Sequence, residues 1–414
     1  MNAKTVVVAG AGYGGVRAAL RLDRELQEDV DIVVIDKGAR QEMYSLLYEA
    51  ATAVISKQAR EQYAELVGTI GVPYERIFAR TRIRFVQAEI RRILLEQKRI
   101  DITTVAGIPE TISFDTIIIA LGSETNYFNI PGLRERAYSL KSIAESLNMR
   151  NALEEIFAAR GSEQRINIVV GGAGFSGIEL SGELVGFLHI LARQHEIPID
   201  RVTLSVVEAS DDILPGAHPS LRRMARRRLE QLGIHLYTGC PIASYDGEAV
   251  YVGNGCALPA DILIWTAGVR ANRIVEALPG VTLSKRCLVV NEYLQVMGVP
   301  YAYGIGDAAV CEKLSANMPA TAQKAIRQGV HAARNIARYY RGNDLGRYVP
   351  KTTAFIAPIG GKFAIAEIGP LRFAGYAAWA LKMLVTLKYL LGILPMKEAF
   401  RVWVGGVWTY IRND

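Results

Sequence analysis

Glycine residues near the N-terminus have the spacing of a phosphate-binding turn. Gly10, Gly12 and Gly15 follow the apolar run "VVVA" and precede a helix-like segment, in the pattern G-x-G-x-x-G. The first glycine permits a tight turn, the second lets a pyrophosphate approach the backbone, and the third lets the helix pack closely on the strand. The helix N-terminus then offers N–H groups and a partial positive charge to the phosphates. The stretch therefore predicts a dinucleotide site.

An acidic residue stands where such a turn requires one. The apolar run "DIVVID" ends in Asp36, 21 residues after Gly15. A carboxylate at the end of the second strand accepts a hydrogen bond from a ribose hydroxyl of the nucleotide. A lone G-x-G-x-x-G is a weak signal, but the preceding strand and this acid argue against a glycine-rich turn of another kind.

The same pattern recurs in the middle of the chain. Gly172, Gly174 and Gly177 follow the apolar run "INIVV", and the next apolar run, "TLSVVEAS", carries Glu208. A carboxylate at this place accepts from the ribose 2′-hydroxyl and repels a 2′-phosphate. Because no arginine follows Glu208 directly, the sequence predicts a preference for NADH over NADPH.

Glu179 lies two residues after Gly177, in the first turn of the expected helix. Two interpretations are open. The carboxylate is either simply stabilised by the helix N-terminus, or it faces the nicotinamide end of the bound nucleotide.

Two dinucleotide sites in one chain favour hydride transfer between two cofactors. One site would hold a permanent flavin and the other a transient nicotinamide, while the protein orients both. The sequence has no convincing Ser-His-Asp, Cys-His or HExxH group, and its five histidines lack ligand-like spacing, so no metal is expected. The four cysteines lack CxxC spacing and are expected to be buried or partly buried thiols. They are Cys240, Cys256, Cys287 and Cys311.

The composition and the order of elements indicate how these residues are positioned. A chain of 414 residues, half of it apolar, is long enough for two or three domains. Strand-like and helical runs alternate over residues 1–120 and again from residue 164, which predicts two mainly parallel α/β sheets. Residues 79–104 alternate with period two, as an antiparallel segment would. The segment "PYAYGIGDAAV" is expected to return to the first sheet.

The net charge of +7 could favour anionic nucleotides or a membrane surface. A nucleic-acid partner is not expected, because the sequence contains no recognition motif and no dense basic stripe.

Residues 371–414 differ from the rest of the chain and contain three of its four tryptophans. Residues 376–394 are apolar nearly all round, with Lys382 and Lys388 able to extend toward water. After Pro395, a second apolar series recurs at helical spacing beside basic residues. This series is Phe400, Trp403, Val407 and Ile411. An apolar, aromatic and basic helix pair is typical of a segment lying in a membrane interface. The alternative is burial in a domain or dimer core.

Motifs along nearly the whole chain resemble the type II NADH dehydrogenases, which are single-subunit NADH:quinone oxidoreductases among the two-dinucleotide-binding-domain flavoproteins. They are "GAGYGG" (10–15), "LLYEAA" (46–51), "FDTIIIALGS" (114–123), "GGAGFSGIELSGEL" (171–184), "WTAGVRAN" (265–272), "YGIGDAA" (303–309), "TAQKAIRQG" (321–329) and "GYAAWALKML" (375–384). The resemblance implies a glutathione-reductase-like α/β fold with two Rossmann-like domains and a C-terminal membrane-associating helical segment. The expected domains are 1–120 with 280–345 for FAD, 121–279 for NADH, and 346–414 for membrane anchoring.

The resemblance also assigns residues to roles. Residues implied at FAD are Gly10, Gly12, Gly14, Gly15, Asp36, Lys37, Ala120, Gly122, Asp307, Ala322 and Gln323. Residues implied at NADH are Gly172, Gly174, Phe175, Gly177, Glu179, Glu208, Ala267 and Gly268. Catalytic roles are implied for Glu179, Gln323 and Lys362, and a quinone contact for Gln323 and Arg327.

The chain departs from the family pattern at the quinone motif, AQxAxQ. Arg327 stands where the second glutamine belongs, and Gln328 follows one place later. An arginine can still donate to a quinone carbonyl, but it brings a charge. The flavin-contact motif ATG is "ALG" at 120–122, and the histidine common before "LLYE" is missing.

The expected activity is hydride transfer from NADH to FAD and two-electron reduction of a membrane quinone, without proton pumping. The expected location is the cytoplasmic face of the cell membrane, with a homodimer left open. One alternative is another flavin-dependent NAD(P)H or sulfide:quinone oxidoreductase, although no cysteine falls within 120–170 or 340–370, where the sulfide enzyme would need one. Another alternative is a nucleotide-binding redox sensor that turns over slowly.

Overall fold

The chain forms two compact units in a computed structural model. The structure describes residues 4–54, 60–161, 163–253, 255–312, 321–350 and 354–413, without the side chains of 60–62, 65 and 409–413. The first unit comprises Met1–Met43, Gly71–Glu124 and Val269–Thr353. The second comprises Tyr44–Ile70, Thr125–Gly268 and Ala354–Asp414.

An eight-stranded sheet forms the centre of the first unit, in the order β21-β22-β8-β1-β2-β5-β6-β7. Strands β22, β8, β1, β2 and the start of β5 are parallel, whereas β5, β6 and β7 form an antiparallel meander. The strands are β1 (Lys4–Ala9), β2 (Val30–Asp36), β5 (Arg84–Leu94), β6 (Arg99–Thr104), β7 (Pro109–Ser113), β8 (Thr116–Ile119), β21 (Gln295–Val296) and β22 (Val299–Gly304). The central residues of β1 and β8 are β-branched and fully buried, as expected for a sheet that is covered on both faces.

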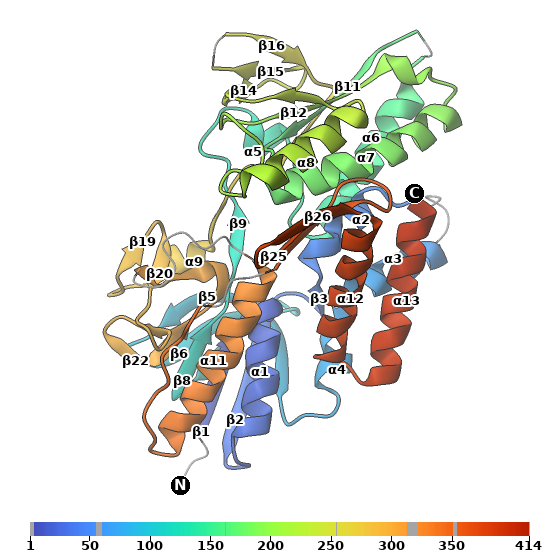
Figure 1. Cartoon of the computed structure of the whole chain (residues 1–414). Coiled ribbons are helices and arrows are strands. Elements are labelled where there is room, and N and C mark those ends of the chain that lie inside the picture. Colours follow the sequence, from blue (N-terminus) through green and yellow to red (C-terminus); the bar gives the residue numbers. More distant parts are fainter. Residues whose placement is uncertain are drawn as a thin grey trace. The chain divides into compact units, whose positions relative to one another are not determined.

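Two long helices of the first unit, α1 (Tyr13–Glu25) and α11 (Ala322–Tyr340), run side by side (Figure 1). Glycine permits this close approach, because a Cβ on Gly329 would lie 2.3 Å from the carbonyl oxygen of Gly14. The smaller elements of this unit are β3 (Arg40–Glu42), β4 (Gly71–Pro73), α4 (Tyr74–Phe78), β18 (Val269–Ala271), α9 (Arg273–Glu276), β19 (Leu283–Ser284), β20 (Cys287–Val289), η3 (Gly306–Ala308) and β23 (Ala309–Val310). Strand β9 (Ser123–Thr125) ends where the second unit begins.

The second unit contains a parallel sheet in the order β10-β17-β11-β12-β13. Its strands are β10 (Tyr138–Ser139), β11 (Ile166–Gly171), β12 (Val202–Val207), β13 (His235–Tyr237) and β17 (Ile262–Trp265). Its helices are α2 (Leu47–Ala51), α3 (Arg60–Ile70), α5 (Leu133–Arg136), α6 (Ile143–Ala159), α7 (Phe175–Gln194) and α8 (Pro219–Gln231). Two antiparallel sheets accompany them: β14 (Ile242–Tyr245), β15 (Ala249–Val252) and β16 (Ala257–Pro259); and β24 (Phe355–Pro358), β25 (Ala364–Ile368) and β26 (Leu371–Gly375).

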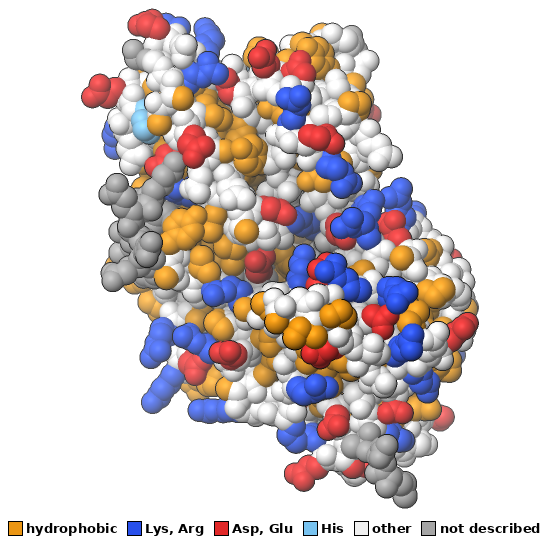
Figure 2. Space-filling view, turned by 180° about the vertical axis from the view of Figure 1, so that it is seen from behind, with side chains coloured by type: hydrophobic (Ala, Val, Ile, Leu, Met, Phe, Trp, Pro, Cys, Tyr) orange, Lys and Arg blue, Asp and Glu red, His pale blue; other side chains and the backbone are white. Residues whose placement is uncertain are grey.

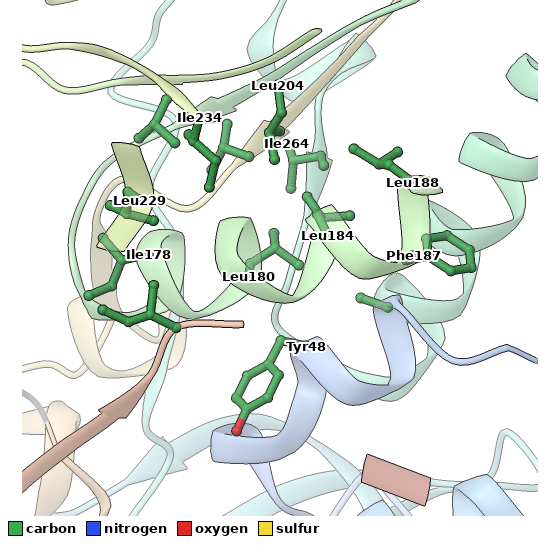
Figure 3. Close-up of a cluster of buried hydrophobic side chains, with 14 of the residues drawn as sticks. Tyr48, Ile178, Leu180, Leu184, Phe187, Leu188, Leu204, Leu229, Ile234 and Ile264 are labelled. Carbon is green, nitrogen blue, oxygen red and sulfur yellow. The ribbon is translucent and has the colours of Figure 1, made fainter. Parts of the chain in front are cut away.

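Helix α7 lies at the centre of the second unit's core. Figure 3 shows Leu204 of β12 and Ile264 of β17 on one side of α7, and Tyr48 of α2 on the other. By length and composition α7 is the single described helix that could cross a membrane. Most of it is buried in this core, so the same composition is explained by its place inside the unit.

The C-terminal residues form helices α12 (Tyr376–Leu391) and α13 (Met396–Asn413) of the second unit. The predicted helix pair is therefore confirmed, but its faces differ from the prediction. The indole Nε1 of Trp403 donates to the Met383 carbonyl at 2.9 Å, and Val407 also packs inward. The outward residues of α13 are Met396, Phe400, Val404 and Trp408. The predicted alternative, burial in a core, therefore applies to one face only. The side chains of Ile411 and Arg412 lie outside the described residues.

The predicted antiparallel segment is confirmed as β5 and β6, and the segment "PYAYGIGDAAV" does return to the first sheet, where β22 pairs with β8. Cys256 is exposed, so the expectation that all four thiols are at least partly buried is wrong there. Figure 2 shows Lys and Arg side chains mixed with Asp and Glu, without a continuous basic stripe among the described residues drawn on that face.

Candidate functional site: two glycine cradles

The turn between β1 and α1 is closed so tightly that only glycine fits at two positions. Gly10 has φ of +97°, and a Cβ on it would lie 2.5 Å from the carbonyl oxygen of Ala120. A Cβ on Gly15 would lie 1.9 Å from the carbonyl oxygen of Gly10. The predicted roles of the first and third glycines in turn and packing match these contacts. Ala120 and Gly122, with φ of +66°, follow the adjacent strand β8.

Gly12, in contrast, faces open space. A Cβ on it would meet no protein atom within 4 Å, and Gly12 is the N-cap residue of α1 with φ of −68°. No side chain caps this helix. The uncapped N-terminus and the open space beside Gly12 fit a pyrophosphate.

The Asp36 carboxylate holds the glycine turn in place. Its Oδ2 accepts from the backbone N–H of Ala11 at 2.7 Å, and its Oδ1 accepts from the N–H of Gly38 at 2.8 Å. Burial raises the pKa of Asp36, and these two N–H groups oppose the shift. Lys37 follows with its side chain exposed.

The turn between β11 and α7 repeats this construction in the second unit. Gly172 has φ of +103°, and its Cβ would lie 2.7 Å from the Cβ of Ala267. A Cβ on Gly177 would lie 1.9 Å from the carbonyl oxygen of Gly172, whereas one on Gly174 would meet nothing within 4 Å. Gly174 is the N-cap residue of α7, and again no side chain caps the helix.

Glu208 corresponds to Asp36 in this second turn. Its Oε2 accepts from the N–H of Ala173 at 2.7 Å, and its Oε1 accepts from the N–H of Ser210 at 2.8 Å. Both cradles therefore share an acid that bonds the loop between the first two glycines. The long helices α6, α8 and α11 have side-chain caps instead, whereas α12, like α1 and α7, begins after a glycine without one.

Two aromatic contacts border the second cradle. The rings of Phe175, the first residue of α7, and Phe355 of β24 lie 4.0 Å apart between centroids. Gly268 has φ of +94°, and its Cβ would lie 2.5 Å from the Phe128 ring.

The predicted quinone-motif residues belong to the first unit, at the start of α11. Ala322 and Gln323 are its first two residues and are half-buried, as is Arg327. Asp307 lies in the same unit, where its Oδ2 accepts from the Ser123 hydroxyl at 2.8 Å. Gln328 is buried and its Oε1 accepts from the N–H of Gly306 at 2.8 Å. The Gln328 amide oxygen is therefore engaged with the loop before Asp307.

Glu179 is the fifth residue of α7 and therefore lies in its second turn. The expectation that it lies in the first turn is wrong, because the helix begins at Phe175, before Gly177. The dipole effect falls off within the first turn and would lower an acid's pKa. Burial instead raises the pKa of Glu179 to about 7, with Lys382 opposing the shift.

Lys382 is the partner that the sequence did not reveal. Its Nζ lies 3.8 Å from Glu179 Oε1 and 6.0 Å from the centre of the Tyr48 ring. Lys382 is buried, so the expectation that it extends toward water is wrong, whereas Lys388 is exposed as expected. The signal was present as a lysine in the middle of an otherwise apolar run, which can mark a buried ion pair as well as an interfacial lysine.

Lys362 lies exposed at the turn between β24 and β25. This turn packs beside α7 and α8, where Arg228 donates to the carbonyl oxygens of Ile359 and Gly360. A Cβ on Gly182 would lie 2.5 Å from the N of Gly360. The structure therefore places Lys362 near the middle of α7 rather than at the glycine turn, and its role stays a prediction.

Two sheets with parallel central strands, each with an uncapped glycine-turn helix and an acid on the turn, define a protein with two dinucleotide-binding folds. Sequence comparison agrees: the chain belongs to the pyridine nucleotide-disulphide oxidoreductase family, whose profile matches residues 4–329. None of its four cysteines is in a disulfide.

Individual relatives define the similarity further. A type II NADH:quinone oxidoreductase of Staphylococcus epidermidis is 29% identical over 395 residues, covering 92% of this chain and 94% of the relative. Among solved structures, NDH2 from Plasmodium falciparum in complex with NADH has a TM-score of 0.84 at 17% identity, covering 98% of both chains. A sulfide:quinone oxidoreductase from Aquifex aeolicus has a TM-score of 0.76 at 19% identity, covering 97% of this chain and 92% of that one. The fold and the resemblance predicted from the sequence are confirmed.

Substitutions of the glycines should separate folding from nucleotide binding. Gly15→Ala forces a methyl group against the backbone, which should lower the free energy of unfolding by about 3 kcal/mol or more. Gly12→Ala should leave the unfolding of the nucleotide-free protein unchanged but abolish binding of the dinucleotide, because its methyl occupies the open space. Gly177→Ala and Gly174→Ala should behave alike in the second cradle. Denaturant unfolding and bound-nucleotide content measure the two effects. Equal destabilisation by both members of a pair would contradict this account.

Proposed function

We propose that the chain is a non-proton-pumping NADH:quinone oxidoreductase that uses FAD. The observation that carries the proposal is the pair of glycine cradles of matching geometry, one in each unit, because electron transfer between two dinucleotides needs two such sites. Its relatives named type II NADH:quinone oxidoreductase support the choice of NADH and a quinone as substrates.

The first cradle is assigned to FAD and the second to NADH. Gly12 and the N-terminus of α1 would hold the FAD pyrophosphate, and Asp36 its ribose. Gly174, the N-terminus of α7 and Glu208 would do the same for NADH. The functional domains are proposed at 1–120 with 280–345, 121–279 and 346–414. When bound, FAD would accept a hydride from NADH and supply two electrons to a quinone.

The quinone contact is assigned to Gln323 and Arg327 of α11. The Gln323 amide and the Arg327 guanidinium both donate hydrogen bonds, which suits the carbonyl oxygens of a quinone. Asp307, held by the Ser123 hydroxyl, is assigned to hydroxyl groups of the flavin side chain.

Glu179 is assigned a proton-transfer role at the nicotinamide end of α7. Its pKa of about 7 gives it comparable charged and neutral populations near neutral pH. Lys382 keeps the charged form accessible despite burial, because an ammonium 3.8 Å away offsets part of the desolvation penalty.

We propose that the outward face of α12 and α13 binds the cytoplasmic leaflet of the cell membrane. Met396, Phe400, Val404 and Trp408 recur every fourth residue of α13 and are 42–68% exposed. Lys388, Lys397 and Arg401 are exposed beside them. An exposed apolar stripe with basic neighbours suits the boundary between headgroups and acyl chains. Binding there would give the protein access to a quinone dissolved in the membrane.

An anaerobic titration tests the activity. NADH should bleach the flavin absorbance of the purified protein, and a ubiquinone or menaquinone analogue should restore it stoichiometrically. Flavin that NADH bleaches but quinone does not reoxidise would favour the redox-sensor alternative. Bleaching of the flavin by sulfide in place of NADH is not expected, because the four cysteines form no disulfide.

The pH dependence should report Glu179. If the neutral carboxyl supplies a proton, the rate of quinone reduction should fall as pH rises through about 7. Glu179→Gln should remove this limb, and Lys382→Met should move it to higher pH, because Lys382 lowers the pKa. The same shift acts on stability. The folded state holds the Glu179 proton more tightly than the unfolded state does. Protonated Glu179 therefore makes its full contribution to the free energy of unfolding below pH 4.5, and this contribution is lost as pH rises through about 7.

Membrane binding should depend on the α13 stripe. Phe400→Glu with Val404→Glu should abolish sedimentation with anionic vesicles, since burial of each apolar side chain contributes about 1.5–3 kcal/mol. Val105→Glu with Ile108→Glu is a matched control, because both residues are exposed in the first unit. NADH oxidation with a soluble acceptor should persist in both variants. Vesicle binding that survives the α13 changes, or is equally lost in the control, would reject this surface.

A further inference from the structure

Lys324, the third residue of α11, is a buried cation without an anionic partner in the described part of the chain. Only 7% of the surface of Lys324 is exposed. No described carboxylate lies within 4.0 Å of its ammonium, and no hydrogen bond of Nζ is found there. The Nζ atom is not fully enclosed by protein and remains accessible.

The surroundings place this ammonium in the proposed flavin site of the first unit. The next residue of α11, Ala325, lies beside two glycines of this site. A Cβ on Gly306 would lie 3.5 Å from the Ala325 Cβ, and one on Gly14 would lie 3.0 Å from the Ala325 carbonyl oxygen. Lys324 therefore lies near the residue assigned to the flavin side chain, directly after Gln323 in the sequence.

The Lys324 ammonium has no anion beside it among the described residues, so a bound anion is expected to complete the site. The Lys324 side chain is not needed to cap α11. The Thr321 side chain already caps this helix by accepting from the Lys324 N–H at 3.2 Å. The AQxAxQ motif leaves this position unspecified.

We propose that the Lys324 ammonium stabilises the negative charge that the pyrimidine side of the flavin ring acquires on reduction. This inference rests on the proposed function. A fixed cation at that edge makes the flavin easier to reduce and makes its N5 more reactive toward nucleophiles. The FAD pyrophosphate is the other anion of the cofactor, but the uncapped N-terminus of α1 already serves it.

Sulfite provides a probe independent of turnover. It adds through sulfur to N5 of an oxidised flavin, and the donated electron pair leaves negative charge on the pyrimidine ring. Lys324→Met removes the charge at nearly constant size, Lys324→Arg keeps it, and Lys285→Met removes an exposed charge in the same unit. FAD content, sulfite affinity and the flavin midpoint potential are measured for all four proteins.

In Lys324→Met we expect full FAD content, sulfite affinity reduced about tenfold or more, and a more negative potential, because a unit charge has been removed at close range. Lys324→Arg should keep most of the sulfite affinity, and Lys285→Met should match the unmodified protein. The FAD-free form of Lys324→Met should unfold at no lower temperature than the unmodified FAD-free protein, since the substitution breaks no ion pair of the described residues.

Three results would overturn the inference. Unchanged sulfite affinity and potential in Lys324→Met would show that the charge does not act on the ring. Loss of FAD with the remaining flavin unaltered would assign Lys324 to the pyrophosphate. Destabilisation of the FAD-free protein would reveal a protein partner for the ammonium. A protein that binds no flavin at all would instead contradict the proposed function.

Discussion

The close contact between a helix start and the preceding turn is the constraint on which the rest of the structure depends. At Gly15 and again at Gly177, a side chain would lie 1.9 Å from a backbone oxygen of the same turn. This contact draws the helix onto its strand and leaves its first N–H groups facing outward without a side-chain cap. The proposed phosphate sites would thus follow from backbone packing. The acids Asp36 and Glu208, which are proposed to bind riboses, also stabilise the loop.

Much of the fold could be predicted from the sequence, because the features that determine it are local. β-branched runs ending in glycine marked β1 and β11, and period-two alternation marked β5 and β6. Return of β22 to the first sheet followed from its strand-like character and the following GIGD turn. These features depend on neighbours within a few residues, which the sequence displays directly.

The site was less predictable because its electrostatics come from contacts distant in sequence. Glu179 and Lys382 are separated by about half of the chain, and only folding brings them to 3.8 Å. The contact between the Gln328 amide oxygen and the Gly306 N–H likewise joins residues that no local pattern connects. On α13 the periodic residues Trp403 and Val407 face inward, and the residues one position later along the helix face solvent. A helical period identifies faces, but not which face the core will cover.

Helix α12 connects an interior ion pair to part of the surface proposed to bind the membrane. One side places Lys382 against Glu179 in the core, while the other presents Leu384 and Leu391 to the outside. A rigid helix moves as one body, so any tilt imposed at its outer side alters the ammonium–carboxylate separation within. Coulomb energy varies inversely with that separation. Docking of α12 on a lipid surface would thereby change the pKa of the buried Glu179 carboxyl. The bilayer would then act on the protein as a bound ligand does.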